Sequence, residues 1–81
     1  MKAVTIYTTP TCGFCKAAKE FLKKHDVSYI EHNVTDDEAA RKEMITLSGQ
    51  LGVPFIIIGE GDDKVMITGF DEQKISEALG V

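Results

Sequence analysis

Two cysteines in the tetrapeptide Cys12-Gly13-Phe14-Cys15 carry the most distinctive chemistry of this sequence, which has no other cysteine in its 81 residues. A thiolate, not a thiol, attacks disulfides, and the unpaired N–H groups at a helix N-terminus favour a thiolate. Cys12 directly precedes a predicted helix. Cys15 follows three residues later on the same helical face, where it can displace a partner bound to Cys12. The spacing therefore predicts thiol–disulfide exchange, with Cys12 and Cys15 as the catalytic pair.

Two cysteines at this spacing can also serve other purposes. A structural disulfide explains them poorly, because a bridge across so short a loop removes little chain entropy. A zinc site needs four ligands, and the spacing of His25 and His32 behind the cysteines differs from that of zinc fingers. We expect both histidines to lie on the surface, and no metal ligand is assigned. An iron–sulfur cluster would need further thiolates from a second chain or from glutathione. A cluster- or metal-binding carrier without redox turnover is the alternative function.

The elements that must position the cysteines follow from the apolar pattern. Strands are predicted over 3–7, 27–33, 55–58 and 64–67, with a turn over 59–63. Helices are predicted from Phe14, from the capping-box sequence Thr35–Glu38 to Gly49, and from an Asp71 cap to Gly80. The order β-α-β-α-β-β-α predicts an α/β fold, in which residues 1–81 form one domain with a four-stranded mixed sheet and helices on both faces.

Three side-chain placements follow from the same pattern. Phe14 begins the apolar stripe of the first helix, so we expect it to pack in the core. Ile30 is expected to face inward from the second strand, together with Val27 and Tyr29. Lys16 lies on the polar side of the first helix and is expected to be a solvated flank.

Composition excludes several classes of partner. The net charge of −4 and the pI near 5.0 give no reason to expect a nucleic-acid partner, which would favour a basic face. No apolar run approaches the roughly 20 residues of a membrane helix, so no membrane partner is expected either. The first residues enter a strand pattern without a signal segment, which predicts a cytoplasmic protein. We expect a monomer.

Gly52-Val53-Pro54 is the second unusual feature, because it places a proline at the start of a strand predicted to be buried. One interpretation is a simple turn into the edge of the sheet. The other is a cis bond that leaves the Val53 backbone free to pair with a substrate strand beside the cysteines. The residues alone favour neither.

Three motifs together resemble the glutaredoxin family over essentially the whole chain. They are the segment Tyr7–Cys15, Val53-Pro54 before an apolar strand, and Gly69-Phe70-Asp71 before the last helix. The resemblance implies a thioredoxin fold, a cis Pro54, Cys12 as the nucleophile and Cys15 as the resolving thiol. It further implies reduction of protein disulfides, and in some members of protein–glutathione mixed disulfides. No cofactor would be bound, and electrons would come from glutathione or thioredoxin reductase.

The sequence also departs from the glutathione-using members. Thr9 stands where these commonly have lysine, and Gly52 where they have threonine, although Asp71 matches the aspartate that holds the amino end of glutathione. Thr68-Gly69-Phe70 is more similar to redoxins that feed ribonucleotide reductase and are reduced by thioredoxin reductase. Phe70 is either a docking aromatic beside Cys12 or a plug over the last helix. We therefore predict faster reduction by a thioredoxin-reductase-type flavoenzyme than by glutathione.

Overall fold

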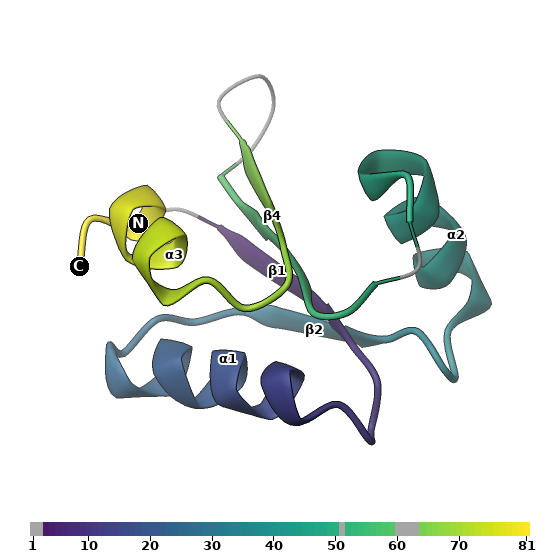
Figure 1. Ribbon diagram of the computed structural model, residues 1–81, viewed down its shortest axis with the longest axis horizontal. Helices are drawn as coiled ribbons and strands as arrows, with labels where there is room; N and C mark the ends of the chain where they lie inside the picture. The colour runs from purple at the N-terminus through teal and green to yellow at the C-terminus, as the bar shows by residue number, and fades with distance from the viewer. Residues whose placement is uncertain (1–2, 51, 60–63) are drawn as a thin grey trace.

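The computed structural model describes residues 3–50, 52–59 and 64–81, and these form a four-stranded mixed sheet with helices on both faces (Figure 1). The predicted order β-α-β-α-β-β-α is confirmed. Along the chain the elements are β1 (Val4–Thr8), α1 (Gly13–Lys24), β2 (Ile30–Asn33), α2 (Glu38–Ser48), β3 (Phe55–Ile58), β4 (Val65–Thr68) and α3 (Glu72–Leu79).

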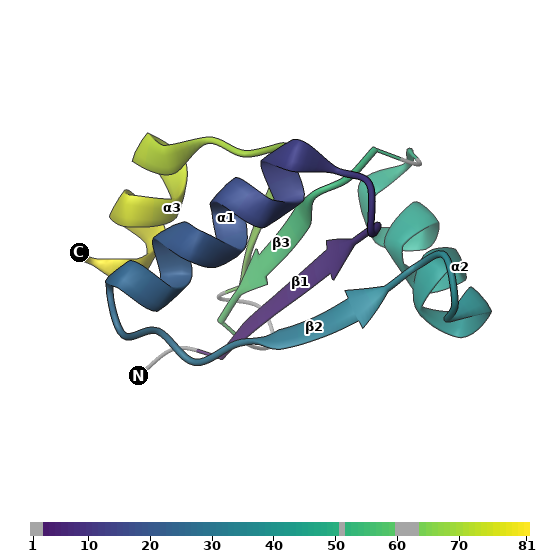
Figure 2. The ribbon, with the colours of Figure 1, turned by 90° about the horizontal axis from the view of Figure 1, so that it is seen from below.

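The strand order in the sheet is β2-β1-β3-β4. β1 pairs in parallel with β2, and both the β1–β3 and the β3–β4 pairs are antiparallel. α1 and α3 cover one face of the sheet and α2 covers the other, as the two views show (Figures 1 and 2). Because β1 is central, the loop that leaves its C-terminal end emerges between neighbouring strands. This loop carries Cys12.

Alternation along the two central strands divides the core between the faces of the sheet. Ile6 and Ile56 face α1 and α3, whereas Tyr7 and Phe55 face α2, and all four side chains are buried. The larger cluster is formed by Val4, Ile6, Ala18, Phe21, Leu22, Ile56, Ile58, Ile67, Ile75 and Ala78. The smaller cluster is formed by Tyr7, Val34, Ala40, Met44 and Phe55.

Two of the side-chain predictions are wrong. Phe14 is 69% exposed although it lies on the same helical face as the buried Phe21, because the first turn of α1 extends beyond the elements that cover the middle of the helix. Ile30 is 62% exposed: β2 is an edge strand that begins only at this residue, and alternation sends Ile30 outward after Tyr29. Val27 and Tyr29 do pack against the larger cluster, but from the loop before the strand. Lys16 is exposed, as predicted.

The second helix begins later than the capping-box pattern predicted. Asp37, not Thr35, is the N-cap of α2, and its carboxylate accepts a hydrogen bond from the Ala40 N–H at 3.0 Å. Asn33 causes the difference, because its side-chain oxygen accepts from the Thr35 N–H at 3.0 Å and holds that residue in a turn. The helix ends at Gly49, whose φ of 75° is left-handed, as predicted. Residues 60–63 of the predicted turn lie outside the described residues.

Candidate active site

Cys12 is the N-cap of α1, as the sequence predicted, and its side chain is partly exposed. Its Sγ accepts a hydrogen bond from the Cys15 N–H at 3.1 Å, one of the N–H groups that the first turn of a helix leaves unpaired. Such a bond is stronger when the acceptor is charged, so the Cys15 N–H can support the sulfur of Cys12 when it attacks a disulfide. The structure therefore offers Cys12 to a partner as an attacking group.

Cys15 lies one turn into α1 and is only 1% exposed. Burial, and after it the hydrogen bond with Cys12, raises the pKa of the Cys15 thiol to about 12. The two cysteines are not bonded to each other in this structure. One thiol thus faces outward and the other is kept behind it, which is the arrangement expected of a nucleophile and a resolving thiol.

The loop before β3 lies against Cys12. The Val53–Pro54 peptide bond is cis, as the family resemblance implied, and pairing of the Val53 backbone with a substrate stays a prediction. The Cys12 thiol donates to the Val53 carbonyl at a sulfur–oxygen distance of 3.8 Å. The Pro54 carbonyl in turn accepts from the Gly69 N–H at 2.7 Å, and Gly69 has a left-handed φ of 82°. The predicted site residues Val53, Pro54 and Gly69 are therefore brought together beside Cys12.

Two further predicted residues have structural roles of their own. The Phe70 ring packs against the larger cluster, with its centroid 6.3 Å from that of Phe21, and remains partly exposed. The plug interpretation of Phe70 is thus supported. The Asp71 carboxylate is the N-cap of α3 and accepts from the Lys74 N–H at 3.1 Å. Its implied contact with the amino end of glutathione stays a prediction.

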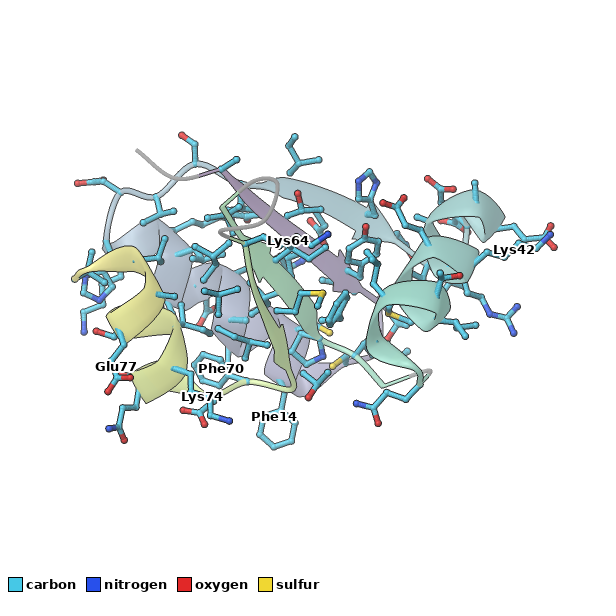
Figure 3. The ribbon with its side chains drawn as sticks, turned by 90° about the horizontal axis from the view of Figure 1, so that it is seen from above. Phe14, Lys42, Lys64, Phe70, Lys74 and Glu77 are labelled. Carbon is cyan, nitrogen blue, oxygen red and sulfur yellow. The ribbon has the colours of Figure 1, made fainter. Side chains whose placement is uncertain are left out.

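The exposed aromatic near the cysteines is Phe14, which sequence reasoning missed as a surface residue. Figure 3 shows its ring pointing away from the body of the molecule, while Phe70 lies between α3 and the sheet. An exposed aromatic ring directly after Cys12 and Gly13 is well placed to contact a partner protein.

Thr9 links Cys12 to a second feature that the sequence did not indicate. Its carbonyl accepts from the Cys12 N–H at 3.3 Å. Its side chain lines a hollow of about 350 Å³ together with Arg41 of α2. A cationic residue from a helix about thirty residues further along the chain therefore borders the same hollow as Thr9.

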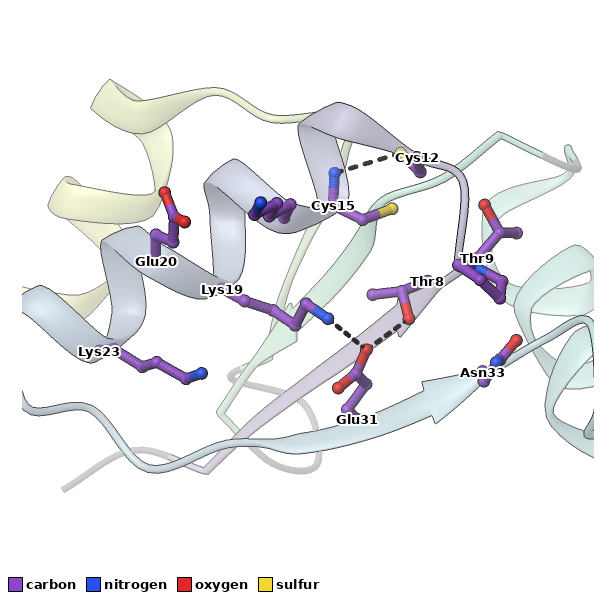
Figure 4. A pocket seen from close by; sticks show the side chains of 11 residues that line it. Thr8, Thr9, Cys12, Cys15, Lys19, Glu20, Lys23, Glu31 and Asn33 are labelled. Carbon is purple, nitrogen blue, oxygen red and sulfur yellow. Dashed lines mark hydrogen bonds and ion pairs between the residues drawn. The ribbon is translucent and has the colours of Figure 1, made fainter.

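On the other side of Thr9, a cleft of about 420 Å³ separates α1 from the edge of the sheet (Figure 4). Within it the Lys19 Nζ lies 2.9 Å from the Glu31 Oε2, which also accepts from the Thr8 hydroxyl at 2.7 Å. The hydrogen bond from Thr8, which has the larger effect, and the one from Lys19 lower the pKa of Glu31 below its ordinary value. The hydrogen bond to Glu31 raises the pKa of Lys19. The pair is charged at neutral pH.

The pH dependence of stability should report the Glu31 contacts. A carboxylate whose pKa is lowered by folding stabilises the fold above its unfolded pKa of roughly 4.3 and loses this contribution as the pH falls through its lowered value. Glu31→Gln should therefore be less stable than wild type at neutral pH, by no more than about 1 kcal/mol since the pair is partly solvated. The difference should vanish in acid, as measured by denaturant unfolding at several pH values.

Glu20→Gln is the matched control, because it removes a carboxylate from an exposed position on the same cleft. It should change the free energy of unfolding less than Glu31→Gln at every pH. Equal effects of the two variants would contradict a specific role of the Glu31 contacts.

Neither histidine joins the cysteines. His25 is exposed and its ring lies 4.6 Å from that of Phe21. His32 is half-buried, not plainly on the surface as expected, because its ring packs 5.3 Å from that of Tyr7. In the described part of the chain no three His, Cys, Asp or Glu residues are grouped to hold a metal ion.

No helix among the described residues is long and apolar enough to cross a membrane.

Residues 4–62, which include both cysteines and the cis proline, match the family model named Glutaredoxin. The chain belongs to the glutaredoxin family. A glutaredoxin-like 8.6 kDa protein from the rubredoxin operon of Clostridium pasteurianum is 42% identical over 94% of this chain and 96% of its own length. This relative is itself uncharacterised.

Solved structures confirm the thioredoxin fold of this glutaredoxin. The thioredoxin-like protein BC3987 superposes with a TM-score of 0.84 and 33% identity, covering 94% of this chain and 99% of the other. The glutaredoxin-like NrdH-redoxin of Escherichia coli, described as having a thioredoxin-like activity profile, superposes with a TM-score of 0.76 and 27% identity. That match covers 93% of this chain and 92% of the redoxin.

Proposed function

We propose that this glutaredoxin is a thiol–disulfide oxidoreductase that reduces protein disulfides through Cys12 and Cys15. The observation that carries the proposal is the placement of one partly exposed thiol at the N-terminus of α1, with the second thiol buried directly behind it. Family membership supports it. The cytoplasmic location, the monomeric state and the single domain stay predictions.

The reaction follows from this arrangement in two steps. The Cys12 thiolate attacks a substrate disulfide, forms a mixed disulfide and releases one substrate thiolate. The Val53 carbonyl and the cis Pro54 lie beside Cys12, where an extended substrate segment can pair with the backbone. Cys15 then attacks the Cys12 sulfur, the protein disulfide forms, and the second substrate thiolate leaves. Removal of glutathione from protein mixed disulfides would use the same steps.

The oxidised protein must then be reduced, and we propose that a thioredoxin-reductase-type flavoenzyme does this faster than glutathione. Glutathione carries two carboxylates, and Thr9 offers no charge to either. The exposed Phe14 ring and the partly exposed Phe70 offer a protein reductant apolar contact. The thioredoxin-like activity described for the similar NrdH-redoxin is consistent with this choice. Arg41 borders the same hollow as Thr9 and offers one cation there, so glutathione is expected to be a slower reductant but still a functional one.

The test compares both electron sources on one model protein disulfide. Wild type should turn over faster with NADPH and thioredoxin reductase than with glutathione and glutathione reductase. Thr9→Lys should raise the glutathione-linked rate by up to about fivefold, since one surface charge contact contributes roughly 1 kcal/mol or less. Phe70→Ala should slow the flavoenzyme-linked rate more than the glutathione-linked rate.

Arg41→Met is the matched control for the charge near Thr9 and should lower the glutathione-linked rate alone. A wild type that already prefers glutathione, with no response to Thr9→Lys, would contradict the proposed reductant. Purified protein that holds stoichiometric iron or zinc and fails to reduce any disulfide would instead favour the cluster- or metal-binding carrier.

A further inference from the structure

The cleft beneath the cysteines joins Cys15 to a set of charged side chains (Figure 4). Its charged lining comes from two elements that face each other across it. α1 contributes Lys16, Lys19, Glu20 and Lys23, and β2 contributes Glu31. Cys12 and Cys15 both line this space. The charged side chains of the cleft therefore share one hollow with the buried thiol.

Lys19 is the cation that the structure fixes in this cleft. It follows Cys15 by four residues on α1, so the two side chains are neighbours on one helical face. Its ammonium is held by the Glu31 carboxylate at 2.9 Å, and Glu31 is itself fixed by the Thr8 hydroxyl of the central strand at 2.7 Å. Two successive hydrogen bonds, from Thr8 to Glu31 and from Lys19 to Glu31, therefore hold the flexible Lys19 side chain in the cleft.

Cys15 needs such a cation because burial opposes its ionisation. Burial raises the pKa of Cys15 to about 12, and the nearby Cys12 sulfur acts in the same direction. The backbone at Thr9 and, after it, the charge of Lys19 act in the opposite direction and lower this pKa. Among the five charged side chains of the cleft, Lys19 is the one whose charge acts on Cys15.

We propose that Lys19, held in place by Glu31 and Thr8, is a positioning residue that stabilises the Cys15 thiolate during the resolving step. In that step the Cys15 thiol gives its proton to water, and its thiolate attacks the Cys12 sulfur of the mixed disulfide. The new Cys12–Cys15 bond forms as the bond from Cys12 to the substrate sulfur breaks. The substrate leaves as a thiolate with the electron pair and takes up a proton from water.

The inference rests on the proposed function, and a single reagent separates the two. Reduced protein mixed with 5,5′-dithiobis(2-nitrobenzoate) releases a first coloured thiolate when Cys12 attacks, at a rate proportional to reagent. It releases a second when Cys15 resolves the adduct, at a rate independent of reagent. The absence of any second release in wild type would overturn the proposed function itself. A second release that occurs in wild type and keeps the same rate in Lys19→Met would overturn only this inference.

Lys19→Met should slow the second release by up to about threefold and leave the first unchanged. One pKa unit lowers the thiolate fraction about tenfold, and the greater nucleophilicity of the more basic thiolate recovers roughly threefold of this. Lys19→Arg keeps the charge and should restore the second release. The pH at which the second release accelerates should move upward in Lys19→Met and return in Lys19→Arg, which a purely structural role would not produce.

Two further variants complete the test. Lys23→Met removes a charge from the same helix and cleft, one turn further from Cys15, and should leave the second release at the wild-type rate. Lys19→Met combined with Glu31→Gln removes both charges and should remain slow. Full recovery in this double variant would overturn the inference, because the unpaired Glu31 carboxylate would then be the cause. A loss in Lys23→Met equal to that in Lys19→Met would also overturn it.

Discussion

Cys12→Ser is expected to abolish disulfide reduction, with a loss of at least about 10³-fold, whichever electron source is supplied. Serine preserves an N-cap acceptor, with oxygen in place of sulfur, but its hydroxyl is a very poor nucleophile toward disulfides at neutral pH. Cys15 cannot take over, because it is 1% exposed and its pKa is raised to about 12. Steady-state reduction of a model protein disulfide measures the loss. Retained stability, measured by denaturant unfolding, would show that the fold survives the change.

Cys15→Ser should fail differently. The first attack by Cys12 is preserved, so a mixed disulfide with the substrate should accumulate and be visible by mass spectrometry of the intact protein. Excess small thiol should then release it slowly. If Cys15→Ser instead eliminates the first attack, and Cys12→Ser still forms a mixed disulfide, the roles of the two cysteines are reversed.

The sequence predicts the elements that carry this site because their signals are local. Cys12 lies directly before an amphipathic helix, Asp71 directly before another, and both are N-caps in the structure. Four apolar residues behind Pro54 predicted a buried strand, and β3 covers these same residues. Pattern and family resemblance together also predicted the cis bond at Pro54, which the residues alone did not decide.

The rest of the site depends on contacts between distant segments, which no local pattern contains. Glu31 reaches Lys19 across the cleft only because β2 pairs in parallel beside β1. Arg41 and Thr9 line one hollow only because α2 packs on the face of the sheet opposite α1 and α3. Helical spacing could have suggested that Lys19 lies on the same face as Cys15. The ion pair that fixes it could not have been found from spacing.

Phe14 shows the limit of periodicity within a single helix. Phe14 and Phe21 are seven residues apart, a spacing that places two residues close to the same face. Phe21 is nevertheless 9% exposed and Phe14 is 69% exposed. The sheet and α3 cover the middle of α1, where Phe21 contacts Phe70, but the first turn projects toward the cysteine loop. Coverage by other elements, and not the pattern of α1, decides which ring is buried.

A pair of matched truncations on α1 should make this difference measurable. Phe21→Ala removes a buried ring from the larger cluster and should lower the free energy of unfolding by about 3–4 kcal/mol, through lost burial and a residual cavity. Phe14→Ala removes the same atoms from an exposed position and should change it by less than about 0.5 kcal/mol. Denaturant unfolding of both variants and wild type, under reducing conditions, measures both values.

The two variants separate stability from contact with partners. Because the Phe14 ring is exposed next to the catalytic pair, its loss should leave the fold intact and weaken saturation by a protein reductant, seen as a higher KM. Phe21→Ala, where it still folds, should leave that KM near the wild-type value because its ring does not reach the surface. A stability loss in Phe14→Ala as large as that in Phe21→Ala would mean that Phe14 belongs to the core after all, and the sequence pattern would then have been the better guide.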